Sequence, residues 1–247
     1  MENIKQAIIS AGGLGTRLRP TTDTMPKPMI PILGEPMLLW HVMQFKKYGV
    51  TDVFFTLYYL PQVVIDYFGD GSKFGITTHY FVEPEPLGSA GGIKKFEKDL
   101  DASFYYIYGD TFSLMDYGAM AKAYATKRNP IGMQRVKKTQ DYADADVAEL
   151  DAHGKFVAIH GKPHEVKYPF DVYRLRGSFI LDKKILDYIP VAGEWDFGKK
   201  LLPELVQRGE NFYGYECNDY SKGIDTPDKW HEVEEYVKSH HIELRTT

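Results

Sequence analysis

Short apolar runs alternate with stretches of helical periodicity through the first half of the chain. The apolar runs predict strands at Gln6–Ala11, Val53–Leu57, Thr77–Val82, Phe104–Tyr108 and Ile131–Val136. The periodic stretches predict helices at Pro36–Tyr48, Pro61–Phe68, Ser89–Phe96 and Tyr117–Lys127. Pro36 falls at the first turn of its helix and Gly49 just past the end, which is the usual placement of these residue types. The alternation is typical of an α/β fold built around a mainly parallel sheet.

In the second half of the chain, the regular alternation of strands and helices gives way to a hairpin and a less regular order of elements. A turn at residues 151–154 separates Val147–Leu150 from Phe156–His160 and predicts a hairpin. Further on, we expect strands at Asp171–Leu181 and Phe212–Glu216, and helices at Lys183–Tyr188, Phe197–Arg208 and Pro227–Ser239. No internal repeat or low-complexity linker interrupts the sequence, so we interpret residues 1–247 as one domain.

Composition excludes several classes of protein. The chain has 247 residues, 43% of them hydrophobic and 26% charged, which is ordinary for a soluble globular protein. The net charge of −4 and the scattered basic residues argue against nucleic-acid and membrane-surface binding. No stretch approaches the roughly 20 apolar residues that span a bilayer. The single cysteine, Cys217, and the absence of a signal-peptide pattern lead us to expect a cytoplasmic protein.

A glycine-rich loop follows the first predicted strand. It reads Ala11-Gly12-Gly13-Leu14-Gly15-Thr16-Arg17-Leu18-Arg19-Pro20 and is followed by Pro26-Lys27-Pro28-Met29. Glycines let the backbone approach a ligand closely and point successive N–H groups at it. An arginine and a lysine on the same loop suit a triphosphate, the first as a planar fork and the second as a point charge. The segment therefore predicts a nucleoside-triphosphate site.

Two other glycine motifs fit this loop less well. A dinucleotide site requires G-x-G-x-x-G, and the third glycine is missing after Gly13 and Gly15. The glycine–lysine–serine/threonine ending of a P-loop is also absent. The ordered set of glycines, Thr-Arg-Leu-Arg-Pro and Pro-Lys-Pro-Met instead resembles the opening motif of the sugar-1-phosphate nucleotidylyltransferases, in the short form without a C-terminal β-helix.

This resemblance implies a fold and a set of nucleotide contacts. The fold would be a Rossmann-like three-layer sandwich with a mixed, mainly parallel central sheet, of the nucleotide-diphospho-sugar transferase type. Residues 1 to about 135 would bind the NTP, and about 136 to 247 the acceptor. Arg17 would bind the β- and γ-phosphates, and Lys27 would lie near the α-phosphate. The nucleotide-binding positions would be Ala11, Gly12, Gly13, Gly15, Thr16, Glu83 and Gly88.

Two aspartates are candidate Mg²⁺ ligands. Asp110 follows the buried-looking strand Phe104–Tyr108 in a Gly-Asp-Thr sequence, and a carboxylate at a strand end can hold this hard cation together with phosphate oxygens. The resemblance places the metal at this position. Asp225, in Gly-Ile-Asp-Thr-Pro, is the candidate second ligand. Because a helix follows, Asp225 and Thr226 are also both candidates for its N-cap.

Glu83 stands at the end of the predicted strand Thr77–Val82, where relatives carry a Gln or Glu that contacts the nucleobase. A carboxylate only accepts hydrogen bonds, so it suits the N–H groups of guanine or the amino group of cytosine. Glu83 can instead be a residue that favours the start of a helix, in which case the neighbouring backbone would read the base.

The acceptor half departs from the family pattern. Lys162 in His-Gly-Lys-Pro matches the family's phosphate-binding lysine, but Gly161 replaces the usual glutamate. Leu175 stands where an asparagine is usual, while Arg176 and Gly177 remain candidates for contact with the sugar phosphate. These changes leave the identity of the acceptor open.

We therefore expect a Mg²⁺-dependent enzyme that joins an NTP and a sugar 1-phosphate, leaning towards GTP with a mannose- or heptose-type phosphate. Uridylyl, thymidylyl or cytidylyl transfer, and a non-sugar phosphate acceptor, remain alternatives. A non-catalytic nucleotide-sugar sensor fits less well, because Arg17, Lys27 and both aspartates are present. A dinucleotide-dependent oxidoreductase is disfavoured by the missing glycine. Relatives are often dimers or tetramers, so a homo-oligomer is compatible with the resemblance, although no apolar stripe marks an interface.

Overall fold

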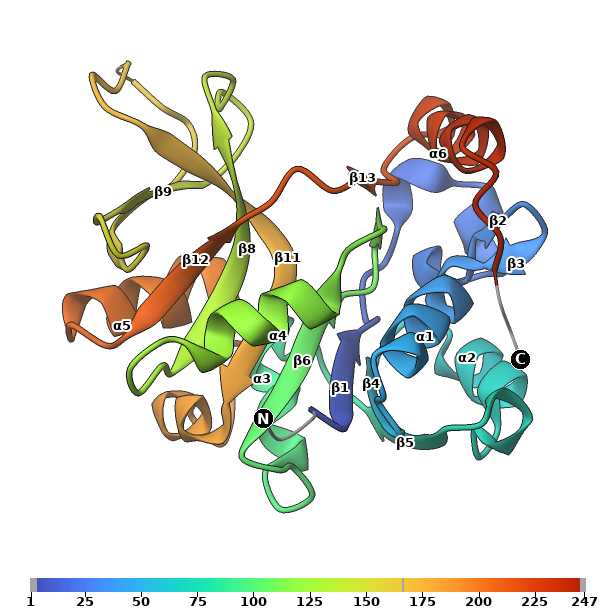
Figure 1. Cartoon of the computed structure of the whole chain (residues 1–247). Helices are drawn as coiled ribbons and strands as arrows, with labels where there is room; N and C mark the ends of the chain where they lie inside the picture. The colour runs from blue at the N-terminus through green and yellow to red at the C-terminus, as the bar shows by residue number, and fades with distance from the viewer. Residues whose placement is uncertain (1–3, 166, 245–247) are drawn as a thin grey trace. The chain divides into compact units, whose positions relative to one another are not determined.

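The chain divides into two compact units in the computed structural model, which describes residues 4–165 and 167–244. Residues 4–86, 107–117 and 219–244 form what we call the N-terminal unit. Residues 87–106 and 118–218 form the central unit (Figure 1). Each unit combines segments that are far apart in the sequence. The interpretation of the whole chain as one domain stays a prediction.

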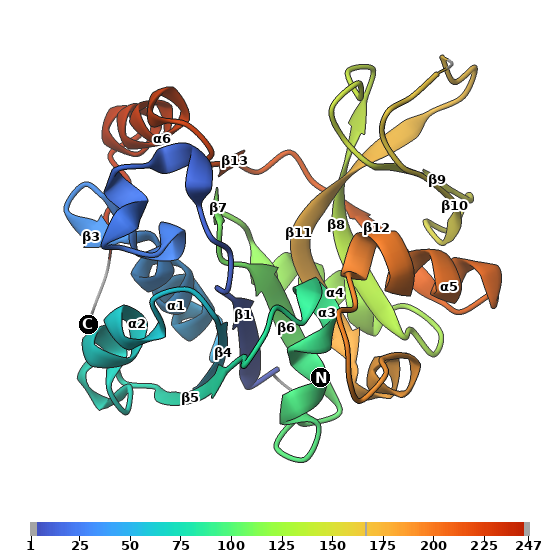
Figure 2. The same ribbon diagram turned by 180° about the vertical axis from the view of Figure 1, so that it is seen from behind.

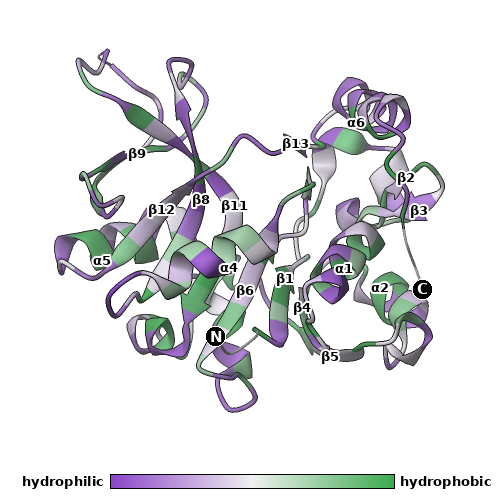
Figure 3. Cartoon of the chain, in the orientation of Figure 1, coloured by the Kyte–Doolittle hydropathy of each residue, from purple (hydrophilic) through white to green (hydrophobic). Residues whose placement is uncertain are grey.

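The N-terminal unit is built on parallel strands. These are β1 (Gln6–Ser10), β4 (Asp52–Leu57) and β5 (Thr77–Val82), with β4 in the middle. Helices α1 (Met37–Lys47) and α2 (Pro61–Phe68) lie beside β4 and β5 (Figures 1 and 2). Residues Ala7, Ile8 and Ile9 are fully buried, and Figure 3 accordingly shows β1 as strongly hydrophobic. Such a continuous apolar run is expected of a strand buried on both faces.

Two short ladders complete the N-terminal unit. Strand β2 (Pro31–Ile32) pairs with β3 (Glu35–Pro36), and β7 (Thr111–Ser113) pairs with β13 (Ser221–Gly223), both antiparallel. Helix α6 (Pro227–Ser239) follows β13. None of these four strands was expected from the sequence, because two or three residues are too few to show an alternating pattern.

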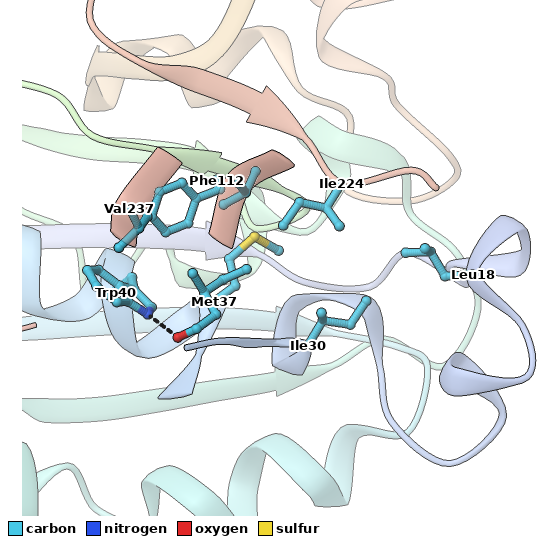
Figure 4. Close-up of a cluster of buried hydrophobic side chains, with 9 residues drawn as sticks. Leu18, Ile30, Met37, Trp40, Phe112, Ile224 and Val237 are labelled. Atoms are coloured by element: carbon cyan, nitrogen blue, oxygen red, sulfur yellow. Dashed lines mark hydrogen bonds between the residues drawn. The ribbon is translucent and has the colours of Figure 1, made fainter. Parts of the chain in front are cut away.

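A hydrophobic cluster connects these elements (Figure 4). Its buried members come from the glycine-rich loop, the segment from residue 30 to α1, β7, the residue that follows β13, and α6. The indole N–H of Trp40 donates to the carbonyl of Ile32 at 3.2 Å, so the one polar atom of that ring is satisfied. The buried members are Leu18, Ile30, Ile32, Met37, Trp40, Phe112, Ile224, Val233 and Val237.

The central unit holds a mixed sheet. Strand β11 (Val172–Asp182) pairs antiparallel with β8 (Gly132–Thr139) and β9 (Val147–Leu150), and it neighbours β6 (Ser103–Tyr108). Strand β10 (Phe156–His160) forms the predicted hairpin with β9, and β12 (Phe212–Glu216) runs parallel to β8. The helices of this unit are α3 (Gly88–Gly91), α4 (Tyr117–Ala125, whose first residue belongs to the N-terminal unit) and α5 (Leu202–Gln207).

The predicted α/β class and the mixed, mainly parallel sheet are confirmed, and so is every strand expected above, within one residue except that β8 continues three residues past the expected end, to Thr139. Three predicted helices differ in detail. Ser89–Phe96 is split into α3 and a 3-10 turn at Ile93–Phe96, because adjacent glycines at 91 and 92 weaken a helix. Phe197–Arg208 begins with a π-helical turn at Phe197–Leu201 before α5. Pro203 lacks an N–H and crowds the preceding turn, and this favours the wider hydrogen-bond spacing of a π-helix at that turn. Lys183–Tyr188 is a 3-10 helix.

Candidate active site

The glycine-rich loop leaves β1 with its backbone N–H groups available. The N–H of Ala11 still bonds to the Thr56 carbonyl at 2.9 Å, as an extension of the β1–β4 pairing. Within the residues that the structure describes, the N–H groups of Gly12, Gly13 and Leu14 donate no hydrogen bond. Consecutive unbonded N–H groups after a strand form a concavity that suits an anion. The loop thus has the backbone chemistry predicted for phosphate binding.

The bend at Gly15 brings Arg17 and Lys27 into the same neighbourhood. Gly15 has φ +61°, and a Cβ atom there would lie 3.0 Å from the Cβ of Lys27 and 3.1 Å from Cγ2 of Thr22. The Thr22 hydroxyl donates to the Gly15 carbonyl at 2.9 Å and fixes the bend. Only glycine meets both requirements. Thr16 opens the 3-10 turn Thr16–Leu18, which carries Arg17.

The β7–β13 ladder brings the two candidate metal ligands together. Asp110 immediately precedes β7, and Asp225 lies two residues after β13. In the register of the ladder, Thr111 pairs with Gly223. The N–H of Ile224 lies 3.4 Å from the Asp110 carbonyl and continues the pairing. Two carboxylates that are 115 residues apart in the sequence therefore reach one place through backbone pairing.

The Lys27 ammonium bridges these carboxylates. Its Nζ lies 3.0 Å from Oδ2 of Asp110 and 2.9 Å from Oδ1 of Asp225, and its side chain is only 7% exposed. Arg17 binds the same Asp225 oxygen at 3.0 Å, although the arginine side chain is 71% exposed. We call Arg17, Lys27, Asp110 and Asp225 the charge cluster. The structure thus brings together the two cations predicted to bind the triphosphate and the two aspartates predicted to bind Mg²⁺.

The environment keeps Asp225 ionised. Burial by itself raises the pKa of this carboxyl. The hydrogen bond from Lys27 and the charges of Lys27, Arg17 and Lys229 outweigh burial, so the pKa lies below its usual value. Lys229, 3.5 Å from Oδ2 of Asp225, was not foreseen. Its position four residues after Asp225, at the start of a helix, is the signal that could have indicated it.

The hydrophobic cluster holds the charge cluster in place. Leu18, Phe112 and Ile224 are buried in that cluster, and each stands one or two residues from Arg17, Asp110 or Asp225 (Figure 4). The side chain of Thr226 accepts the N–H of Lys229 as the N-cap of α6, which leaves the Asp225 carboxylate for the site. Of the two predicted cap candidates, the threonine takes that position.

The donor set fits Mg²⁺. Two carboxylates already converge on one cation, the ammonium of Lys27, so the local field favours positive charge at this point. Mg²⁺ is usually bound in proteins by one or two carboxylates and completes its shell with water and phosphate oxygens. In residues 4–165 and 167–244, no three His, Cys, Asp or Glu side chains gather as a ready-made metal cage. The remaining ligands would therefore come from the substrate and water.

Glu83 lies next to the glycine-rich loop. It follows β5, its N–H donates to the Leu57 carbonyl at 2.7 Å, and it is 7% exposed. A Cβ on Gly12 would lie 3.9 Å from a carboxylate oxygen of Glu83 and 3.2 Å from the Cβ of Tyr58. The glycine at position 12 therefore keeps the backbone close to this buried carboxylate.

The other predicted contacts lie in the central unit, and their roles stay predictions. Gly88 has φ +73°, and a Cβ there would lie 2.8 Å from the Trp195 carbonyl, so packing against this loop requires a glycine. Lys162 donates from Nζ to the Asp144 carbonyl at 3.0 Å. Arg176 and Gly177 lie on β11, beside β8. In the part of the chain that the structure describes, no helix is long and apolar enough to cross a membrane.

The fold and the site together define a class of phosphate-binding proteins. In this class, a glycine-rich loop and clustered cations and carboxylates lie at the strand ends of a parallel α/β layer. The sequence profile of the nucleotidyl transferase family matches residues 6–237, and the chain belongs to this family.

Two relatives and one solved structure show what the chain is similar to. The chain is 31% identical to a UTP–glucose-1-phosphate uridylyltransferase of Synechocystis, across 92% of the chain and 62% of that protein. It is 28% identical to a D-glycero-alpha-D-manno-heptose 1-phosphate guanylyltransferase of Aneurinibacillus thermoaerophilus, across 96% of the chain and 100% of that protein. A structure described as a putative glucose-1-phosphate thymidylyltransferase from Bacillus anthracis has the same fold. The TM-score is 0.82 at 22% identity, over 94% of this chain and 95% of that one. The chain thus spans about three fifths of the length of the Synechocystis relative.

Proposed function

We propose that this protein catalyses Mg²⁺-dependent nucleotidyl transfer from an NTP to a sugar 1-phosphate, yielding an NDP-sugar and pyrophosphate. The charge cluster carries this proposal: two cations and two carboxylates meet at the end of a glycine-rich loop. Named relatives transfer uridylyl or guanylyl groups to sugar 1-phosphates, which supports the same reaction class here.

The reaction requires alignment and charge neutralisation rather than a general base. A non-bridging oxygen of the acceptor phosphate attacks the α-phosphorus, the bond to the bridging oxygen breaks, and pyrophosphate leaves with the electron pair. The attacking phosphate is already anionic near neutral pH, because its second pKa is about 6. Fixed positive groups then stabilise the charge that develops on the leaving group.

Each residue of the charge cluster has a distinct part in this proposal. Arg17 would move from Asp225 to the β- and γ-phosphates, which its high exposure permits. Lys27, held between the carboxylates, would neutralise the α-phosphate. Asp110 and Asp225 would hold Mg²⁺, which supplies further charge neutralisation at the same phosphate. Lys162 would bind the acceptor phosphate.

GTP is the favoured nucleotide, with a mannose- or heptose-type phosphate as acceptor. A buried carboxylate beside the loop, Glu83, can accept from both the N1–H and the N2 amino group of guanine. The heptose 1-phosphate guanylyltransferase that matches the chain over that relative's whole length supports the same choice. UTP is the second candidate, because the Synechocystis relative uses it.

Replacement of either aspartate by its amide tests the proposal. Asp110→Asn and Asp225→Asn should each lower pyrophosphate release by about a thousandfold or more, since an amide cannot neutralise the metal's charge. Asp66→Asn, an exposed aspartate of α2, is the matched control and should retain activity. Circular dichroism would verify that all three variants are folded. Activity in Asp110→Asn close to that of the wild type would refute the metal assignment.

A further inference from the structure

Strand β11 contains a bulge where it pairs with β8, and this bulge includes Arg176. Leu175 pairs with Val136 and Phe179 pairs with Gln134, so residues 176–178 all lie opposite Arg135. The side-chain amide of Gln134 donates to the Arg176 carbonyl at 2.9 Å and holds this irregular stretch. Bulges of this kind re-aim side chains and are frequent beside binding sites.

The bulge concentrates positive charge. Arg135 is 2% exposed, Arg176 is partly buried, and Arg174 lies two residues before Arg176. Burial lowers the pKa of Arg176, the charges of Arg174 and Arg135 lower it further, and the charge of Asp144 partly opposes them. Within the residues that the structure describes, the Arg176 guanidinium makes no hydrogen bond or ion pair. A cation held beside like charges and partly removed from water is unfavourable, and a bound anion relieves that cost.

A lysine belongs to the same neighbourhood. Lys162 donates through its Nζ to the carbonyl of Asp144 and through its backbone N–H to the carboxylate of Asp146, at 3.0 and 3.1 Å. Asp144 also binds Arg174 at 2.9 Å, and the Asp146 carbonyl accepts the N–H of Leu175. The segment 144–146 therefore links Lys162 to the stretch of β11 that carries Arg176.

Two positions of this neighbourhood, Gly161 and Leu175, have side chains without a hydrogen-bonding atom. Gly161 and Leu175 stand where a glutamate and an asparagine would contact the sugar in the pattern that this chain otherwise resembles, and neither side chain can form a hydrogen bond. Arg176 and Lys162 thus stand beside two positions that offer no side-chain hydrogen bond to an acceptor. This favours recognition of the acceptor by charge over recognition by hydroxyl groups.

We propose that the acceptor carries a second anionic group, a carboxylate or a second phosphate, which Arg176 binds while Lys162 binds the reacting phosphate. The inference rests on the proposed nucleotidyl transfer and specifies its acceptor. A planar guanidinium suits either group, because both present two oxygens to its paired N–H donors.

Binding measurements with a matched set of acceptors test this inference. Glucose 1-phosphate, glucuronic acid 1-phosphate and glucose 1,6-bisphosphate differ mainly at C6, which is neutral, a carboxylate or a phosphate. By isothermal titration calorimetry, at least one of the two doubly anionic compounds should bind the wild-type protein about tenfold or more tightly than glucose 1-phosphate. The carboxylate and phosphate arms show which second anion the site accepts.

Variants assign the preference to Arg176. Arg176→Gln should remove most of the difference between the compounds, and Arg176→Lys should keep part of it. Arg128→Gln, an exposed arginine of the same unit, is the matched control and should leave the difference intact. Three results would overturn the inference. The three compounds could bind the wild-type protein with equal affinity, Arg176→Gln could lower the affinity for all three by the same factor, or none of them could bind measurably.

Pyrophosphate release with the same compounds separates the two proposals. An Arg176-dependent preference in binding, without release of pyrophosphate from any NTP, would contradict nucleotidyl transfer and keep the second anion site. If pyrophosphate is released with glucose 1-phosphate at least as efficiently as with the two doubly anionic compounds, nucleotidyl transfer is supported and the second anion site is refuted.

Discussion

At the scale of single residues, Lys27 is the part of the charge cluster that the structure constrains most. It is almost fully buried and touches both carboxylates, so its removal leaves two negative groups facing each other. We expect Lys27→Met to lower the free energy of unfolding by about 1–3 kcal/mol, less than for a fully buried pair because Asp110 is half exposed. Urea denaturation would measure this change.

A double-mutant cycle tests the origin of that loss. Asp225→Asn in the Lys27→Met background should cost less than in the wild type, because the pair with Lys27 is already gone while the pairs with Arg17 and Lys229 are removed in both backgrounds. Strictly additive changes in the free energy of unfolding would contradict a direct interaction between Lys27 and Asp225.

At the scale of elements, the β7–β13 ladder determines where Asp225 lies. Ile224 is fully buried between this ladder and α6, and Ile224→Ala should destabilise the protein by about 2–5 kcal/mol. Ile185→Ala, at an equally buried position of the central unit, is the matched control for stability. Turnover should fall at least tenfold further in Ile224→Ala, because Asp225 is attached directly to the disturbed residue. Equal turnover in the two variants would contradict the positioning role of the ladder.

The long elements were predictable from the sequence, and the short ones were not. Strands such as β5 and helices such as α2 and α6 carry clear periodicity and start at the expected residues. The β7–β13 pairing joins segments more than 100 residues apart, and no local pattern in three-residue strands reveals it. The sequence therefore predicted Asp110 and Asp225 as partners only through a family resemblance, and their backbone link came from the structure.

The sequence predicts which charged residues belong to the site, but it does not predict which of them contact one another. Arg17 and Lys27 were expected to face phosphates, and in the structure both bind Asp225. This pairing depends on the β7–β13 ladder, which brings residue 225 to the loop and which loop composition does not encode. The bulge at Arg176 was equally hidden, since a strand with one irregularity has the same composition as a regular one.

At the scale of the whole molecule, a buried histidine makes stability depend on pH. His41 of α1 is 1% exposed, and burial lowers its pKa to about 4, against the opposing effects of the Thr111 backbone and the Asp110 charge. In the unfolded chain its pKa is about 6.5, so between these values the unfolded state binds more protons. The free energy of unfolding should therefore fall by about 3 kcal/mol as the pH drops from 6.5 to 4.

A variant without the titrating ring isolates this contribution. His41→Leu should show a smaller decrease in the free energy of unfolding between pH 6.5 and pH 5 than the wild type, as measured by urea denaturation at each pH. The same slope in both proteins would mean that His41 does not titrate in this range.

The most direct test of nucleotidyl transfer is a screen for pyrophosphate release. GTP, UTP, CTP, dTTP and ATP would each be combined with hexose, heptose, amino-sugar and non-sugar phosphates, with Mg²⁺ and with a chelator in its place. We predict release that needs Mg²⁺ and both substrates, fastest with GTP because of Glu83. If an NTP binds but no combination releases pyrophosphate, the charge cluster is a nucleotide-binding site only, and the proposed reaction is wrong.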